Sequence, residues 1–352
     1  MAAIKDVAKL AGVSVAAVSK YLKTPNNMRE DTRQRIAQAI EELNYRPNPF
    51  AQSLRTGKTN IIAIAIPELD NPYFNKMFKL LQEFCEERGY MAILLKNATV
   101  EQAKNAAGIL RSGLVDGVIC YNEGQANTFI MELDAGIPVV KIDPVITDDY
   151  PATVGIDLKT GIEKLCAHLE AVGVRRLGYI GPVSDASSGQ KVDALKHYCA
   201  GSGLYLDPDV FLTDCYTYGG GFDCCRRLLD SGVLLPDAIV VESDMIALGV
   251  LKCLVGRGVR VPEDIRLTGY DNTDISVMSN PSLTSVDIPM EDICLAALNL
   301  RPDAGRNRGA CDFSHGVEDQ SLYHAAGLTG GIFSHESIHK LCVNRFTIAF
   351  SL

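Results

Sequence analysis

The first 45 positions carry apolar residues at spacings of three and four, the period of an amphipathic helix. Three such sets follow one another: Ile4, Val7, Ala8 and Ala11; Val15, Val18, Tyr21 and Leu22; Ile36, Ile40 and Leu43. Gly12 can adopt a left-handed conformation without steric cost, so it ends the first helix. Ser14 then stands where a side chain can cap the second helix. A turn this short predicts a helix-turn-helix, followed by a third helix over about residues 30–44.

The pattern changes at Ile61, where short continuous apolar runs begin to alternate with helical stretches. We expect strands over 61–66, 90–95, 117–120, 137–142, 153–156, 176–180, 210–213, 238–241 and 266–269. The expected helices cover 73–88, 100–112, 159–173, 188–201, 220–231 and 244–257. Continuous apolar strands that alternate with helices indicate parallel sheets covered on both faces. Two such series predict two doubly wound lobes, with ligands bound outside the carboxyl ends of the strands.

The segment between the two patterns reads "YRPNPFAQSLRTGKTN". Pro47 and Pro49 end the third helix because proline removes a backbone donor and clashes with the preceding turn. Residues 48–54 suffice for one short helix, which is too short to be stable alone in water. We therefore expect a helix that forms only when it is docked, which is suited to a switch.

Charge is distributed unevenly along the chain, whose formal net charge is −9. Residues 1–58 hold ten Lys and Arg against five Asp and Glu, and the remaining 294 residues hold 24 against 38. A basic N-terminal segment on an acidic body indicates a polyanionic partner for the segment.

Several classes of protein do not fit the sequence. The start lacks the apolar region of a secretory signal, and the longest apolar runs, of about six residues, are too short for a membrane span. The eleven cysteines are irregularly spaced and contain no CxxC, so we expect core residues in a reducing cytoplasm. Phosphate-loop, GxSxG and HExxH motifs are absent, and we expect no catalysis, metal or cofactor.

Motifs from residue 2 to about residue 300 occur in a specific order: "IKDVAKLAGVSVAAVSKYL", "TRQRIAQAIEELNYRPNPFAQSLRTGKT", "NPYF", "PVV", "GYIGP", "VPEDIRLTGYDN" and "PSLTSV". This series resembles the LacI/GalR family, the lactose and galactose repressor group. The resemblance implies a helix-turn-helix head and two lobes like those of type 1 periplasmic binding proteins. It also implies operator DNA, a small-molecule effector and a homodimer as partners.

The resemblance places the second helix in the DNA major groove. It implies that Val15, Ala16, Ala17 and Lys20 face the bases, where the apolar side chains suit a thymine methyl and Lys20 can donate to guanine. Ser14 and Asn27 would contact phosphates, although Ser14 can equally act as a helix cap alone. Leu54 matches the leucine that family dimers insert into the minor groove at the operator centre; the alternative is a residue of the hinge core.

The same resemblance and the loops after the strands supply candidate effector contacts. They are Tyr73, Phe74, Ser187, Lys191, Tyr216, Ser243, Asp244 and Asp271. Aromatic rings, carboxylates and a cation around hydroxyl groups would suit a sugar or a sugar phosphate. Tyr73 and Phe74 can instead belong to the lobe core, and Asp244 can instead cap a helix.

The expected organisation has four parts: the head, 1–46; a hinge, 47–59; a core, 60–300; and an atypical tail, 301–352. Within the core, lobe 1 would cover about 60–155 plus 285–300, and lobe 2 about 156–284. The tail holds four of the six histidines and no clear period, and the resemblance stops at Leu300. A shifted reading frame near Leu300 would explain this and would leave a core strand missing; a divergent tail is the alternative.

These features together predict a cytoplasmic regulator of transcription. We expect a dimeric repressor of sugar-utilisation genes that binds a palindromic operator and responds to a ligand between its lobes. A sugar-binding protein of transport type has the same core, but that class needs a signal peptide where this chain has a DNA-binding type of head.

Overall fold

The computed structural model describes residues 2–46, 57–97, 99–121, 137–143, 152–300, 340–343 and 347–349. The chain divides into two compact units, Met1–Thr59 and Asn60–Leu352, which we call the head and the core. The predicted hinge helix and Leu54 lie outside the described residues. None of the described helices is long and apolar enough to cross a membrane.

The described part of the head is a helix-turn-helix followed by a third helix. Its elements are α1 Ile4–Ala11, α2 Val15–Lys23, a 3₁₀ turn at Pro25–Asn27 and α3 Glu30–Glu42. Gly12 ends α1 with φ 64° and ψ 39°, and Ser14 Oγ accepts a hydrogen bond from the Ala17 amide at 3.2 Å. Both helix boundaries at the turn are therefore as predicted.

The head has its own apolar core. It consists of Val7, Ala8, Ala11, Val18, Ile36 and Ala39. Helix α1 packs against both α2 and α3, and small alanine side chains on its buried face let the helices approach closely. The alanines of the opening stretch therefore serve the packing of the head.

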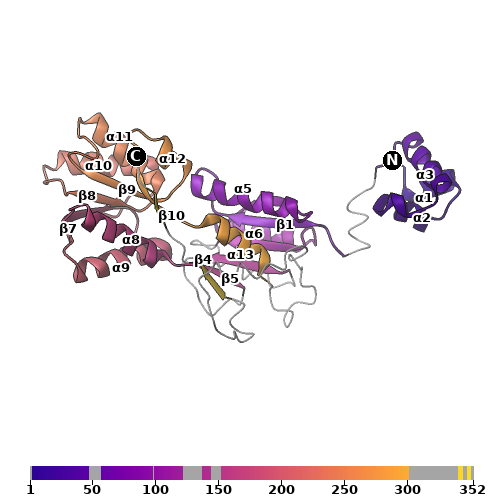
Figure 1. The fold of residues 1–352 in the computed structure, drawn as a ribbon, viewed down its shortest axis with the longest axis horizontal. Coiled ribbons are helices and arrows are strands. Elements are labelled where there is room, and N and C mark those ends of the chain that lie inside the picture. The colour runs from indigo at the N-terminus through magenta and orange to yellow at the C-terminus, as the bar shows by residue number, and fades with distance from the viewer. Residues whose placement is uncertain are drawn as a thin grey trace. The chain divides into compact units, whose positions relative to one another are not determined.

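Lobe 1 of the core is built on a six-stranded sheet in the order β11-β5-β4-β3-β1-β2. The strands are β1 Ile61–Ile66, β2 Met91–Lys96, β3 Gly117–Tyr121, β4 Val139–Asp143, β5 Thr153–Ile156 and β11 Lys340–Val343, and every described pair is parallel. The helices are α5 Pro72–Glu87, α6 Val100–Leu110 and α13 Met290–Asn299 (Figure 1). Alternate residues of β1 face opposite sides: Ile62, Ile64 and Ile66 join one apolar cluster, and Ile61, Ala63 and Ala65 pack in another.

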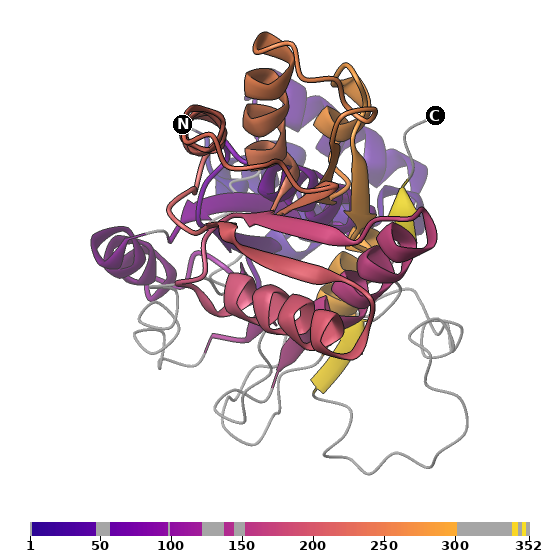
Figure 2. The same ribbon diagram turned by 90° about the vertical axis from the view of Figure 1, so that its left-hand side faces the viewer.

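Lobe 2 is built on a second six-stranded sheet in the order β12-β10-β9-β8-β6-β7. The strands are β6 Arg176–Ile180, β7 Tyr205–Leu212, β8 Ala238–Val241, β9 Arg266–Asp271, β10 Thr284–Asp287 and β12 Thr347–Ala349. The helices are α8 Leu158–Ala171, α9 Ala186–Gly201, α10 Tyr218–Asp230, α11 Asp244–Gly256 and α12 Asp274–Met278. Figure 2 shows the sheet between helices on both faces, and all described pairs except β10–β12 are parallel, as expected of a doubly wound lobe.

Several boundaries differ from the sequence predictions by one or two residues, and three differences bear on the architecture of lobe 2. Strand β7 begins at Tyr205 rather than near residue 210, because its polar residue Asp207 is paired with Arg176 of the neighbouring strand. Strand β9 extends to Asp271, which is therefore its last residue. Strand β10 pairs in register with β9, so the chain returns to lobe 1 after Asp287 and not at residues 284–285.

Residues from the tail pair with both sheets. Strand β11 lies beside β5 and β12 beside β10. The tail thus supplies strands at the edge of each sheet, in contrast to the expectation that a strand would be missing. The shifted reading frame itself stays a hypothesis.

One pair of cysteines differs from the prediction that the cysteines are separate core residues. Cys215 and Cys224 are joined as a disulfide, with Cα atoms 6.5 Å apart. Cys215 precedes α10 and Cys224 lies within it, and Gly220 has no side chain to keep that segment away from the helix. Six of the seven free cysteines whose side chains the structure describes are buried, in agreement with the prediction.

Candidate functional site

The opening turn of α2 presents a contact surface on the head. Val15 is 39 % exposed, and Ser14, Ala16 and Lys20 are exposed as well. Ala17 is half-buried, and Val18 is the buried residue of this helix. The predicted base-facing residues therefore share the outer side of α2, apart from Ala17, which lies closer to the core.

Cationic side chains accompany this surface. Helices α1 and α2 carry four lysines, Lys5, Lys9, Lys20 and Lys23. In the described part of the head, none of these lysines takes part in an ion pair. The arginines of α3 are instead paired within their own helix, Arg33 with Glu30 and Arg35 with Asp31. Positive charge on α1 and α2 is thus available for a polyanion.

Lys191 is the buried cation at the carboxyl ends of the lobe 2 strands. It is 5 % exposed, its Nζ donates to Glu242 Oε1 at 2.7 Å and to the Glu242 carbonyl at 3.2 Å, and it lies 4.0 Å from the centre of the Tyr270 ring. Burial lowers the pKa of Lys191, but the carboxylates of Glu242, Asp271 and Asp185 outweigh burial and hold the pKa above its usual value. The ammonium group is therefore charged and neutralised from within the protein.

Asp244, predicted as an effector contact with a helix cap as the alternative, lies one residue after the N-cap of α11. Ser243 is the N-cap of α11, and its Oγ accepts from the Ile246 amide. Asp244 is 1 % exposed; it accepts from Ser285 Oγ at 2.6 Å, from the Thr273 amide at 2.7 Å and from Thr273 Oγ1 at 2.9 Å. Burial raises its pKa to about 6 in spite of these bonds. The carboxylate ties α11 to the segment after β9 and to β10.

The turn after β9 has an unusual backbone and joins the lobes. Asp271 has φ 100° and Asn272 has φ 44°, and residues other than glycine rarely adopt such positive φ angles. Asn272 is held by its amide to Ser285 Oγ and by its side chain to Asp287, each at 3.0 Å. Its carbonyl accepts from Lys76 Nζ of lobe 1 at 3.4 Å. Strained backbone of this kind is concentrated at functional sites.

The two predicted aromatic contacts of lobe 1 lie in its core. Tyr73 and Phe74 are both buried at the start of α5. Their rings and that of Tyr121 meet edge to face, with centroids 5.0–5.8 Å apart. The alternative of lobe-core residues describes their position in this structure.

Two further predicted contacts of lobe 2 are near the surface. Tyr216 is 59 % exposed, and its hydroxyl lies 3.2 Å from Ser184 Oγ in the loop after β6. Ser187 is half-buried in the first turn of α9. The exposed Tyr216 ring is available for stacking against a ligand.

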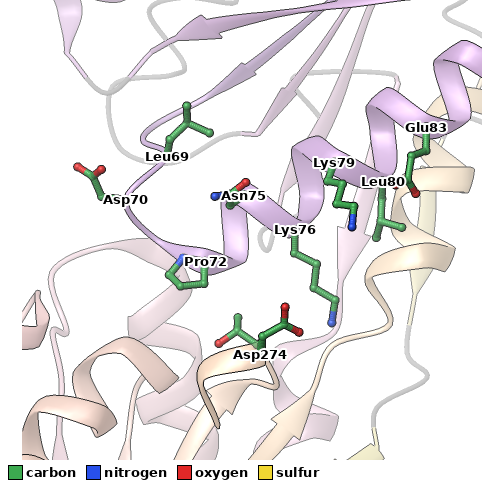
Figure 3. A pocket seen from close by; sticks show the side chains of 10 residues that line it. Leu69, Asp70, Pro72, Asn75, Lys76, Lys79, Leu80, Glu83 and Asp274 are labelled. Atoms are coloured by element: carbon green, nitrogen blue, oxygen red, sulfur yellow. The ribbon is translucent and has the colours of Figure 1, made fainter. Parts of the chain in front are cut away.

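A cavity of about 480 Å³ lies between α5 of lobe 1 and the start of α12 of lobe 2 (Figure 3). Its lining residues are Leu69, Asp70, Pro72, Asn75, Lys76, Lys79, Leu80, Glu83, Thr273 and Asp274. None of the eight predicted effector contacts lines it. It is adjacent to the Lys76–Asn272 contact and has charges of both signs.

Sequence reasoning missed two residues of this region. Glu242, the partner of Lys191, directly follows β8 and stands beside the selected Ser243 and Asp244, so its position after a strand could have revealed it. Lys76 carried no such signal, because its contact with Asn272 joins residues 196 positions apart.

A capped, cationic helix-turn-helix on one unit and two doubly wound lobes on the other define a bacterial regulatory protein with a DNA-binding head. Residues 3–48 match the family described as bacterial regulatory proteins, lacI family, and residues 166–305 match the periplasmic binding protein-like domain. The chain belongs to the LacI family, because a relative of this type is 31 % identical over most of both chains.

That relative is the catabolite control protein A of Staphylococcus epidermidis, with 84 % of this chain and 90 % of the relative covered. The ribose operon repressor of Escherichia coli K12 is 29 % identical, covering 85 % and 92 %. Among solved structures, the Lac repressor bound to ONPG in the repressed state has a TM-score of 0.72 at 25 % identity, with 83 % and 90 % covered.

Proposed function

We propose that this chain is a cytoplasmic transcriptional repressor that binds a palindromic operator as a homodimer. The observation that carries the proposal is the exposed opening of α2, where Val15, Ala16 and Lys20 share one side of a capped helix. A helix of this kind enters the major groove with its first turns against base edges. Ser14 and Asn27 would bind phosphates, and Leu54 would enter the minor groove at the operator centre.

The core supplies the response to a small molecule. A ligand that binds between the lobes shifts the balance of their arrangements and, through residues 47–59, the affinity for the operator. Coupling of about 1–3 kcal/mol would change that affinity roughly 5- to 150-fold. The candidate contacts are Lys191, Tyr216, Asp271 and Ser187, supported by their common position at or after the carboxyl ends of lobe 2 strands.

Relatives named as an operon repressor and a catabolite control protein favour regulation of sugar use over any catalytic role. We therefore propose a sugar-type effector and regulation without catalysis.

A DNA-binding selection from a random library tests the proposal with the purified full chain at fixed salt. We expect enrichment of a palindrome, because two heads related by a two-fold axis read two half-sites. We expect a CG step at its centre, where Leu54 would enter the minor groove and kink the DNA. An enriched site without two-fold symmetry would contradict the dimer, and no enrichment would contradict the DNA-binding role.

A further inference from the structure

The described connections that leave the carboxyl ends of the strands are acidic. Those that follow β1, β2 and β5 to β10 contain six Asp and Glu and no Lys, Arg or His among the residues that the structure describes. These residues are 67–71, 97, 99, 157, 181–185, 213–217, 242–243, 272–273 and 288–289. Because ligands of doubly wound sheets bind at this edge, the composition bears directly on the charge of the effector.

The buried cation nearest to this edge in lobe 2, Lys191, is already paired with a carboxylate of the protein. Lys191 donates twice to Glu242 and faces the Tyr270 ring. Asp271 and Asp185 add further negative charge close enough to affect the lysine. One ammonium group is thus set against three carboxylates, and an anionic ligand would meet net repulsion.

The cavity between the lobes shows the same balance. Its lysines, Lys76 and Lys79, are accompanied by three carboxylates, those of Asp70, Glu83 and Asp274 (Figure 3). Lys76 also donates to the Asn272 carbonyl. The cavity therefore has no excess of positive charge.

Helix N-termini are the other common binding site for phosphate, and side chains close six of the eight described in the core; α12 and α13 have no side-chain cap. Helices α5, α6, α8, α9, α10 and α11 are capped by Asn71, Thr99, Asp157, Asp185, Thr217 and Ser243. Two of these caps are carboxylates, and Asp185 accepts from both the amide and the hydroxyl of Ser188. At these six helices a phosphate would have to displace the cap, and at α8 and α9 it would also approach a carboxylate.

We propose that the effector is an uncharged polyhydroxyl compound and that Glu242, by neutralising Lys191, excludes phosphorylated and carboxylated ones. This inference rests on the proposed function and decides between the two ligand classes that the sequence left open. Hydroxyl groups are donors that carboxylates bind strongly, and the exposed Tyr216 ring offers an apolar surface for a sugar ring.

Isothermal titration of the full chain with inorganic phosphate and with glucose 6-phosphate tests the exclusion, in chloride buffers of matched ionic strength. We expect no saturable binding by the wild-type chain. Glu242→Gln should bind inorganic phosphate at least about tenfold more tightly, because Lys191 loses its neutralising partner. Glu263→Gln removes an exposed carboxylate outside these connections and should behave as wild type.

Saturable phosphate binding by the wild type that Lys191→Gln abolishes would overturn the proposal, as would a folded Glu242→Gln chain that gains no affinity. Thermal unfolding reports whether Glu242→Gln is folded, and if it is not, the wild-type titration decides alone. Failure of the operator selection would overturn the proposed function and leave the calorimetric result unaffected, so the two failures are distinguishable.

Discussion

At the scale of single residues, the polar contacts around Asp244 depend on a glycine. A Cβ at Gly269 in β9 would collide with the Asp244 carboxylate, which is held by Thr273 and Ser285. Local sequence could select the residues after strand β8 but could not tell that Ser243 caps α11 while Asp244 faces inward, because that choice depends on partners 29 and 41 positions away.

Gly269→Ala should lower the free energy of unfolding by about 1–3 kcal/mol, the usual cost of an overpacked buried site. Gly256→Ala is the matched control: the glycine ends α11 with open space around its Cβ position, and the change should be neutral or stabilising by up to about 1 kcal/mol. Urea unfolding of both variants measures the difference. Equal stability of the two would show that the Asp244 contacts tolerate a methyl group.

Asp244 also predicts a pH dependence of stability. Its folded pKa of about 6 lies above the ordinary value of 3.8, so the folded chain binds a proton that the unfolded chain has already lost. Stability contributed by this proton is present below pH 4 and is lost as the pH rises to about 6.

Asp244→Asn should remove that dependence, which amounts to about 3 kcal/mol at most at roughly 1.4 kcal/mol per pKa unit. Unfolding of both chains between pH 4 and 7 provides the measurement. A constant difference between the two across this range would be inconsistent with the raised pKa.

At the scale of elements, the sequence predicts an element correctly where the element's own residues specify it, and fails where a distant strand does. The strands at 153–156, 176–180 and 238–241 coincide with their apolar runs, because those runs are buried on both faces. The start of β7 and the strands β10, β11 and β12 were missed, since their conformation depends on pairing with a neighbouring strand and not on their own period.

The disulfide between Cys215 and Cys224 predicts an effect of reductant on stability. It closes a short loop, with a sequence separation of 9, that carries Tyr216. Reduction should lower the free energy of unfolding by about 2–3 kcal/mol, mainly because the unfolded chain gains conformational entropy when the loop is opened. Thermal unfolding with and without dithiothreitol should show the shift in the wild type and not in Cys224→Ser; identical curves for the oxidised and reduced wild type would argue against the bond.

At the scale of the whole molecule, opposite charges on the two units predict a strong effect of salt. The head has a charge of +5 and the remainder −14, so attraction to DNA resides in the head alone. Operator affinity should fall steeply as salt rises, because bound phosphates release counterions.

Lys20→Ala in both subunits should weaken operator binding and reduce the slope of log affinity against log salt by about 1 to 2. Lys252→Ala, which removes an exposed positive charge from α11 of the core, is the control and should leave the slope unchanged. Fluorescence anisotropy at several salt concentrations measures both. An unchanged slope for Lys20→Ala would remove this residue from the interface.

The path of the chain between the lobes has a consequence for how such proteins diversify. Apart from β12, lobe 2 is one continuous stretch from α8 to β10, and α8 packs against β10, so the two ends of the stretch are close together. A stretch with adjacent ends can be exchanged as a cassette between homologous genes. Because one apolar cluster runs through both lobes, a successful exchange must also match the side chains of that shared core. Recombination can therefore alter half of a ligand site in one event, while the head and its operator stay the same.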